Sequence, residues 1–226
     1  MNFEVESDSK IMNCILVILK KKHLLGLIIF ILIWLYAGVL SAQPGKLTEA
    51  KGLLQSGYFQ EAEVILDEIN SGKNSEVLLL LGNLYNGNSK YKVNYKKAVT
   101  FYVKAAELGN PEAAYNLGVL YFQGRGVPQN YQKAFAWYSK SSKRGFAPAQ
   151  NNLGFLYQKG MGTEQSNTNA YGWYSISAAN GLRAGLKNRD ILLAQLIEEE
   201  GAEVVSDIQG QALQCVQNNY ENCFED

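Results

Sequence analysis

The sequence predicts an all-α protein, an α/α superhelical solenoid built from helix–turn–helix repeats. Three observations predict this fold. Small and aromatic residues recur at a fixed period of 36 residues, in the triplets Gly82, Gly118 and Gly154; Tyr85, Tyr121 and Tyr157; Ala98, Ala134 and Ala170; and Tyr102, Tyr138 and Tyr174. Apolar residues within each period follow helical spacing. A glycine ends each period, at Gly109, Gly145 and Gly181. A fixed period of this size is typical of stacked supersecondary units.

Composition and charge place the chain among ordinary globular proteins. Its 226 residues are 47% hydrophobic and 19% charged, and its formal net charge is zero. Because the chain has no net charge, long-range electrostatics does not attract it to nucleic acid, and we expect no nucleic-acid partner. Lysines are dense between Lys90 and Lys104, and no basic residue follows Arg189. A solvated surface accounts for both patterns.

The pattern of charged and apolar residues over 1–42 predicts an export segment. A lysine triplet at 20–22 precedes an apolar run over 24–40, which ends at small residues, Ser41 and Ala42. This order is typical of a signal peptide, with translation starting at Met1 or Met12. The run is also long enough to remain as an uncleaved membrane tether through 24–40. Both alternatives place the rest of the chain outside the cytoplasm, in the periplasm or cell envelope or anchored to the inner membrane.

Residues 43–74 predict a pair of helices that caps the solenoid at its N-terminal end. Gly57 and Tyr58 mark the turn between the two helices. Apolar residues with helical spacing are Leu53, Leu54, Ala62, Ile65, Leu66 and Ile69. The pair looks like a tetratricopeptide-type hairpin with a shorter loop than the units that follow, as suits a terminal capping unit.

Three repeats follow, over 75–110, 111–146 and 147–182. The glycine inside each first helix is unfavourable there, so its recurrence indicates that a neighbouring helix approaches too closely for a Cβ atom. Good N-cap residues begin the second helices at Asn94, Asn130 and Ser166. Pro111 suits the first turn of the next helix.

The middle repeat, NLGVLYFQGRGVPQNYQKAFAWYSKSSKRG, closely resembles the Sel1-like repeat family. The resemblance covers about 75–182, and in the first repeat Phe101 stands where Trp137 and Trp173 stand in the others. It implies a non-enzymatic adaptor that binds other proteins through the concave face of the superhelix. Residues 183–226 also resemble the helical C-terminal cap and the cysteine-containing tail of exported bacterial members.

Two cysteines, Cys215 and Cys223, remain once Cys14 in the leader is set aside. An even pair in an exported chain predicts a disulfide. Eight residues of straight helix span about 12 Å, which is too far for a disulfide, so pairing requires the chain to double back near Asn218 and Asn219. The alternative is two unpaired thiols on a frayed tail.

The chain lacks the residues of common catalytic sites. Its one histidine, His23, lies in the leader, which leaves no imidazole for a Ser-His-Asp, Cys-His or His-zinc site in a processed chain. The glycine pairs at 124–126 and 160–162 follow helices and predict turns, not phosphate cradles. Glu198–Glu200 predict a solvated helix face. We therefore expect no catalytic, metal or cofactor site and no enzymatic activity.

Positions that differ between repeats mark a candidate partner-binding stripe on the first helices. The stripe contains Leu79, Asn83, Asn86, Tyr115, Val119, Phe122, Asn151, Phe155 and Gln158. Its members recur at i, i+4 and i+7, which places them along one side of each helix. Exposed aromatic side chains are effective anchors for a protein or peptide. The alternative is that these residues pack against the neighbouring helix, as we expect for Trp137, Tyr138, Trp173 and Tyr174 of the second helices.

The sequence thus predicts an exported, non-enzymatic scaffold that binds a protein or peptide through its repeat face. One alternative is an envelope protein that binds cell wall or carbohydrate through exposed aromatic residues. Another is a regulator tethered by 24–40 that restrains a membrane partner.

Overall fold

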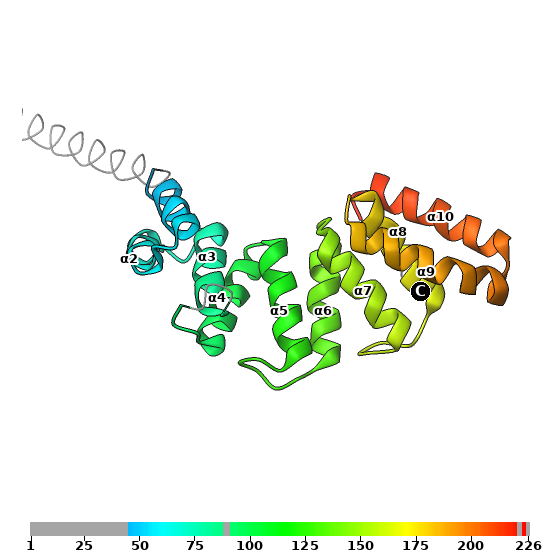
Figure 1. Ribbon diagram of the computed structural model, residues 1–226, viewed down its shortest axis with the longest axis horizontal. Coiled ribbons are helices and arrows are strands. Elements are labelled where there is room, and N and C mark those ends of the chain that lie inside the picture. Colours follow the sequence, from blue (N-terminus) through cyan, green and yellow to red (C-terminus); the bar gives the residue numbers. More distant parts are fainter. Residues whose placement is uncertain (1–44, 88–90, 221–222, 225–226) are drawn as a thin grey trace, which may run out of the picture.

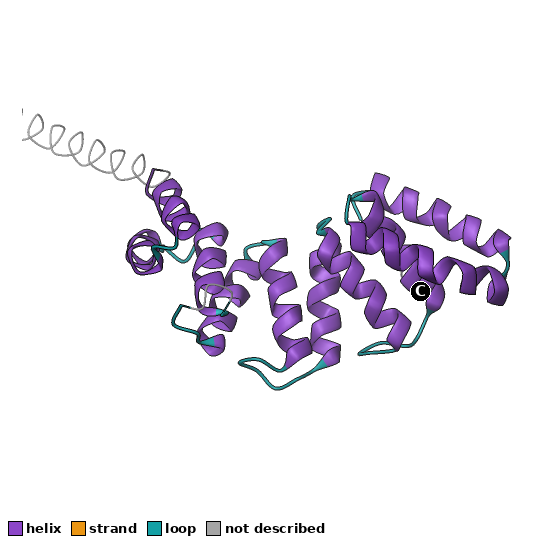
Figure 2. Ribbon diagram, in the orientation of Figure 1, coloured by secondary structure: helices purple, strands orange, loops and turns teal. Residues whose placement is uncertain are grey.

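A computed structural model describes residues 45–87, 91–220 and 223–224. Every regular element within these ranges is a helix. The helices follow one another in a curved row from α2 to α10, joined by loops (Figures 1 and 2). The prediction of an all-α solenoid is therefore confirmed.

The helices alternate in the order that the period predicts. Residues 45–56 are helical and precede α2 (Phe59–Ile69). The helix pairs of the three repeats are α3 (Ser75–Tyr85) with α4 (Tyr95–Glu107), α5 (Pro111–Gln123) with α6 (Tyr131–Ser142), and α7 (Ala147–Lys159) with α8 (Asn167–Ala179). Two longer helices, α9 (Arg183–Glu200) and α10 (Ala202–Gln217), follow.

The second helix of each repeat begins at the N-cap that the sequence predicts. The side chains of Asn94, Asn130 and Ser166 each accept a hydrogen bond from the backbone N–H three residues later. These bonds satisfy a donor that the first helical turn leaves without a backbone partner. Pro111 occupies the first turn of α5, also as predicted.

Each repeat is held together where a tyrosine of the second helix crosses the glycine of the first. A Cβ atom added to Gly118 would lie 2.5 Å from the Tyr138 ring, and Tyr102 and Tyr174 cover Gly82 and Gly154 in the same way. Tyr138 is 2% exposed there. The predicted close approach of the helices is confirmed, and it is an aromatic ring that fills the space.

Loops between the helices of one repeat rest on the preceding repeat. Gly126 and Gly162 have φ angles of 75° and 77°. A Cβ atom at either position would collide with the backbone of the preceding second helix, at Tyr95 or Tyr131. These glycines are therefore parts of interhelical turns, as predicted, and they help to stack one repeat on the next.

The N-terminal helices pack on the first repeat. Ala50 and Leu66 join Val77 and Leu81 of α3 in one buried cluster. Glu63 of α2 accepts hydrogen bonds from Tyr85 and, at 3.0 Å, from Tyr91. Apolar and polar contacts together thus hold α2 on the first repeat.

The 36-residue pattern continues into α9. Asn188 lies 36 positions after Asn152, and Leu192 lies 36 positions after Leu156. Leu192 is fully buried, so α9 takes the place of the first helix of a further repeat. It is followed by α10, which packs on α8 and on α9.

A disulfide joins Cys215 at the end of α10 to Cys223, with 5.3 Å between their Cα atoms. The chain reverses at Asn219 and Tyr220, whose φ angles are 53° and 66°. Both the predicted pairing and the predicted reversal after α10 are confirmed. The predicted export segment, 1–42, lies outside the described residues. Within the described ranges, no helix combines the length and the apolar character that crossing a bilayer requires.

Candidate partner-binding surfaces

The repeat helices form two layers. Direct contacts join the first helices to one another: Asn116 of α5 donates a hydrogen bond to Asn83 of α3 at 3.2 Å, and Asn188 of α9 donates one to Asn151 of α7 at 2.8 Å. Because α3 touches α5 and α7 touches α9 in this way, and Phe122 of α5 contacts Phe155 of α7, the first helices make a continuous layer. The second helices, α4, α6 and α8, lie beside that layer.

The candidate stripe lies within this layer of first helices, where repeats meet. Leu79 is only 7% exposed and belongs to the core, so it is not available to a partner. The other eight members are half-buried, namely Asn83, Asn86, Tyr115, Val119, Phe122, Asn151, Phe155 and Gln158. The stripe is therefore a partly accessible seam between repeats.

Aromatic members of the stripe pack on neighbouring helices and loops, within a repeat or across two repeats. The rings of Phe122 and Phe155 meet edge to face, with centroids 6.2 Å apart. Tyr115 lies between Tyr138 and Phe146, with centroids at 5.8 and 5.3 Å. The structure thus brings these residues together, as the alternative of packing against a neighbouring helix expects, and leaves only part of each ring accessible.

Polar members of the stripe satisfy the buried tyrosine hydroxyls. Tyr102 donates to Asn83 at 2.7 Å and accepts from Asn86 at 2.6 Å. Tyr174 donates to Gln158 at 3.1 Å, and burial raises the pKa of Tyr174 to about 12. Because desolvation disfavours the phenolate, these hydroxyls stay protonated and act as hydrogen-bond donors.

The outer faces of the second helices differ sharply between repeats, a feature that the sequence analysis missed. On α4 and α6 this face is exposed and basic, and it carries Lys96, Lys97, Lys104, Lys133, Lys140, Lys143 and Arg144. The helix α8 contains no charged residue, and α10 and the tail cover it. The complete lack of charge from Asn167 to Ala179 was the signal that another element packs there.

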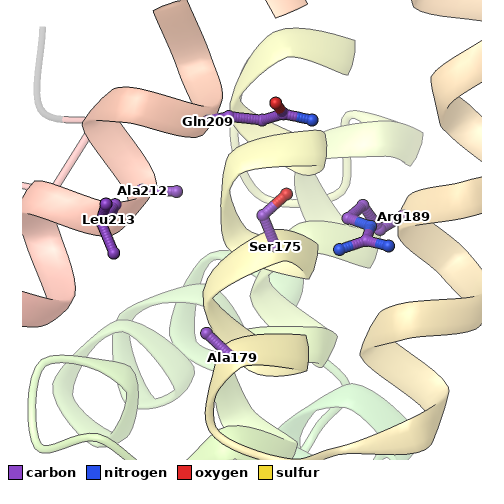
Figure 3. A pocket seen from close by; sticks show the side chains of 6 residues that line it. All are labelled: Ser175, Ala179, Arg189, Gln209, Ala212 and Leu213. Atoms are coloured by element: carbon purple, nitrogen blue, oxygen red, sulfur yellow. The ribbon is translucent and has the colours of Figure 1, made fainter. Parts of the chain in front are cut away.

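A pocket of about 210 Å³ lies between α8, α9 and α10. Its walls are formed by Ser175, Ala179, Arg189, Gln209, Ala212 and Leu213 (Figure 3). Arg189 donates two hydrogen bonds to one carboxylate oxygen of Asp190, at 2.9 and 2.7 Å. Its charge is thus already partly neutralised beside the pocket.

Potential ligands for a metal ion do not cluster in the part of the chain that the structure describes, where no group of three or more His, Cys, Asp or Glu residues is close enough to share an ion. What the described surfaces offer is binding chemistry: half-buried aromatic rings and amides on one layer, and exposed cations on the other.

Comparison with known proteins identifies the repeats. The family model described as Sel1 repeat matches residues 75–110, 111–146 and 147–182. The search of curated proteins found no match.

Two crystal structures have similar folds. The Sel1 repeat protein from Oxalobacter formigenes is 27% identical, with a TM-score of 0.62, over 68% of this chain and 62% of that one. The protein c5321, a protective antigen of uropathogenic Escherichia coli with an SLR fold, is 26% identical, with a TM-score of 0.64, over 71% of this chain and 34% of that one. This chain thus matches less than two thirds of the length of either protein. The chain thus contains three Sel1 repeats, over 75–182, and its fold is similar to the solenoids of these two proteins.

Proposed function

We propose that this protein is a non-enzymatic scaffold, exported to the cell envelope, that binds a protein or peptide partner through its repeats. Sel1 repeat proteins are typically scaffolds for protein interaction. The observation that carries the proposal is the seam along the first helices, whose half-buried residues differ from repeat to repeat over a constant core. A surface that varies while its support stays fixed is what a solenoid uses to recognise a partner.

Features of sequence and structure support export. The leader has the order of a signal peptide, and the disulfide between Cys215 and Cys223 suits an oxidising compartment. N-terminal sequencing and intact mass of the protein from an envelope fraction test this. We expect a start at Gln43 and a mass that increases by two hydrogen atoms on reduction. A start at Met1 or Met12 would mean that 24–40 is kept, and it would favour a membrane-tethered regulator.

Amine-to-amine crosslinking in intact cells tests the scaffold role. We expect the wild-type protein to capture a defined partner, and Phe122→Ala with Phe155→Ala to lose it because both substitutions remove apolar area from the seam. Val64→Ala with Leu213→Ala is the matched control, since these exposed side chains lie on α2 and α10. Absence of any captured partner, or equal capture by both double variants, would contradict the scaffold role at this seam.

Ring geometry favours a protein partner over the carbohydrate alternative. Sugar platforms present an open aromatic face, whereas Phe122 and Phe155 cover each other and Lys140 lies 5.1 Å from the centroid of the Trp137 ring. Co-sedimentation with purified cell wall would separate the two functions, and we expect the protein to stay in the supernatant.

A further inference from the structure

The exposed outer face of α4 and α6 is a second surface with a defined chemistry, here called the basic face. Its basic side chains are the seven named above, and Glu107 is the acidic residue among them. The ion pairs formed by described residues join Lys46 to Glu68, Lys51 to Glu76, Lys92 to Glu63 and Arg189 to Asp190. None of these pairs includes Lys96, Lys97, Lys104, Lys133, Lys140 or Arg144, and these six exposed cations give the face its positive charge.

The same positions on α8 show what happens when this face is covered. Lys104 and Lys140 lie 36 residues apart, and Ile176, a further 36 residues on, takes their place on α8 and is fully buried. Thr100 and Ala136 are exposed, but their counterpart Gly172 is buried. A Cβ atom on Gly172 would overlap the ring of Phe224, so glycine at this position makes room for the tail.

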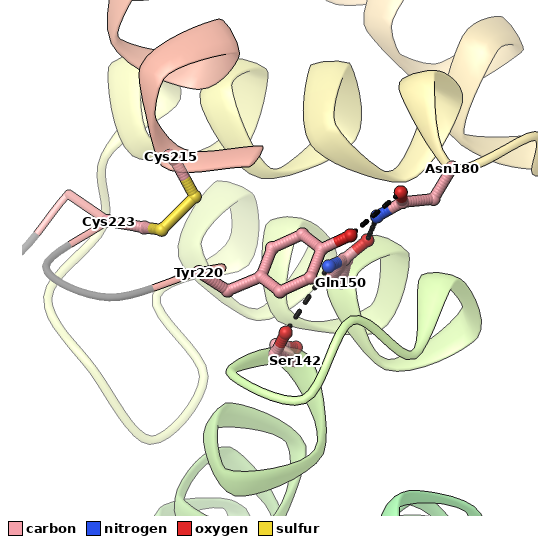
Figure 4. Close-up of a disulfide and its surroundings, with 6 residues drawn as sticks. All are labelled: Ser142, Gln150, Asn180, Cys215, Tyr220 and Cys223. Atoms are coloured by element: carbon pink, nitrogen blue, oxygen red, sulfur yellow. Dashed lines mark hydrogen bonds between the residues drawn. A yellow bond between two sulfur atoms is a disulfide. The ribbon is translucent and has the colours of Figure 1, made fainter. Parts of the chain in front are cut away.

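The described residues of the chain's own tail, Tyr220, Cys223 and Phe224, are therefore a bound segment. Phe224 meets Trp173 edge to face, with centroids 5.9 Å apart. Tyr220 donates a hydrogen bond to Asn180 at 2.9 Å, and Asn180 donates in turn to the fully buried Gln150 at 2.8 Å (Figure 4). In sequence this tail, Tyr-Glu-Asn-Cys-Phe-Glu-Asp, combines two aromatic residues with three acidic ones.

One repeat earlier, the corresponding site is open and basic. Trp137 occupies the position of Trp173 but is only half-buried, and Lys140 lies over its ring. An aromatic side chain placed there as Phe224 is placed on α8 would contact Trp137. Acidic neighbours on the same segment would then lie beside Lys133, Lys140 and Arg144, where opposite charge favours them.

We propose that the basic face binds an acidic segment of a partner protein that carries aromatic side chains. The inference rests on the proposed scaffold function and names the surface and the partner's chemistry. Phe224 on α8 is the internal example of the aromatic contact, and lysine at 140 in place of isoleucine at 176 suits the open site to a partner that also carries acid. A surface made only for an anionic membrane or nucleic acid would need the cations but not the adjacent tryptophan site.

The probe is a fluorescein-labelled peptide with the sequence of residues 216–226 and the substitution Cys223→Ser. It is titrated with the full chain, whose disulfide is kept intact so that the cis tail stays on α8, and binding is read by fluorescence anisotropy. We expect saturable binding that weakens as salt rises. Lys133→Glu with Lys140→Glu should weaken it about tenfold or more, because each reversal replaces an attraction by a repulsion. Replacing both aromatic residues of the peptide by alanine should also weaken it.

Lys73→Glu with Lys159→Glu is the matched control, since it makes the same change in net charge at exposed positions away from the basic face. If the two double variants weaken peptide binding equally, the loss of binding comes from net charge alone and the proposal is overturned. It is also overturned if the peptide does not bind to the wild-type protein. Binding to phosphatidylglycerol vesicles but not to the peptide, or self-association abolished by Lys133→Glu with Lys140→Glu, would likewise overturn it. If cells still yield a crosslinked partner while the peptide fails, the scaffold role stands and only the basic-face inference falls.

Discussion

Glycine in the middle of each first helix sets how closely the two helices of a repeat approach. The Tyr138 ring occupies the space where a Cβ atom of residue 118 would lie. Gly118→Ala should therefore lower the free energy of unfolding by about 1–3 kcal/mol, as expected for overpacking, and Gly118→Leu should cost more. Urea denaturation followed by circular dichroism measures both.

Gly210 is the control for this substitution. It also lies inside a helix, α10, but a Cβ atom added there would meet nothing within 4 Å. Gly210→Ala should leave stability unchanged or raise it by about 0.5–1 kcal/mol, because alanine is the better helix former. Equal losses from the two substitutions would contradict the packing role of Gly118.

Trp137 and Trp173 show what residue identity can and cannot predict. Both lie at the same position of the 36-residue period, and the sequence pattern predicts both in the core. Trp173 is 3% exposed, whereas Trp137 is half-buried. The difference arises because α10 and the tail cover Trp173, and the lack of charge over 167–179 indicates that some element packs there without indicating which one. The predicted N-caps, by contrast, depend on bonds within four residues, and all three are present.

At the scale of an element, Glu63 attaches α2 to the first repeat. Burial alone would raise the pKa of Glu63, but hydrogen bonds from Tyr85, Lys92 and Tyr91 hold that pKa below its ordinary value. A carboxylate with a lowered pKa contributes stability that is complete above its unfolded pKa, about 4.3, and is lost as the pH falls through the folded pKa. The contacts of α2 with the first repeat should therefore weaken below about pH 4.

Glu63→Gln tests this attachment. It removes the charge and should raise hydrogen exchange in α2 at neutral pH, while exchange in α5 to α8 stays unchanged. The variant should also lose the acid-dependent increase in exchange across α2 that we expect of the wild-type protein. Glu61→Gln, at an exposed position on the same helix, is the control and should behave as wild type.

The disulfide fixes the tail as a separate element. It closes a short loop, which contributes about 2–3 kcal/mol in the chain-entropy treatment. Reduction should loosen only the residues after about 212, because Leu192, Leu196, Val205 and Ile208 are buried against α8. Hydrogen exchange of Cys215→Ser with Cys223→Ser measures it, and exchange spreading into α5 or α6 would contradict it.

Element order was predictable from the sequence, but the position of α10 was not. The 36-residue period and the N-cap residues predict α3 to α8, because both signals are local in sequence and recur along the chain. Packing of α10 on α8 depends on contacts between residues far apart in sequence, such as Gln209 with the Tyr171 hydroxyl at 2.7 Å. The same limit applies to the seam, where Leu79 was expected at the surface and is buried because α5 stacks on α3.

At the scale of the whole molecule, the residues on the outer face of α8 are suited to the C-terminal segment that covers them. Solenoid repeats contact only their neighbours, so stability is close to a sum of local contributions. Repeats one and two expose lysine on their second helices, whereas repeat three relies on α10 and the tail after it to cover Gly172, Trp173 and Ile176. Loss of α10 should therefore damage repeat three and leave α3 to α6 folded.

The substitution Ile176→Lys tests whether repeat three depends on α10, because its expected effects are opposite in the full chain and in a chain without α10. In the full chain the substitution buries an unpaired charge beneath α10 and should lower stability by about 3 kcal/mol or more, because charges without partners are costly in the core. In a chain ending at Gly201 the same lysine restores the pattern of Lys104 and Lys140. It should reduce the self-association that the uncovered apolar face causes. Unfolding and sedimentation velocity of the four proteins measure both effects. If the lysine harms both chains or neither, α10 is not what determines the residue type on the outer face of α8.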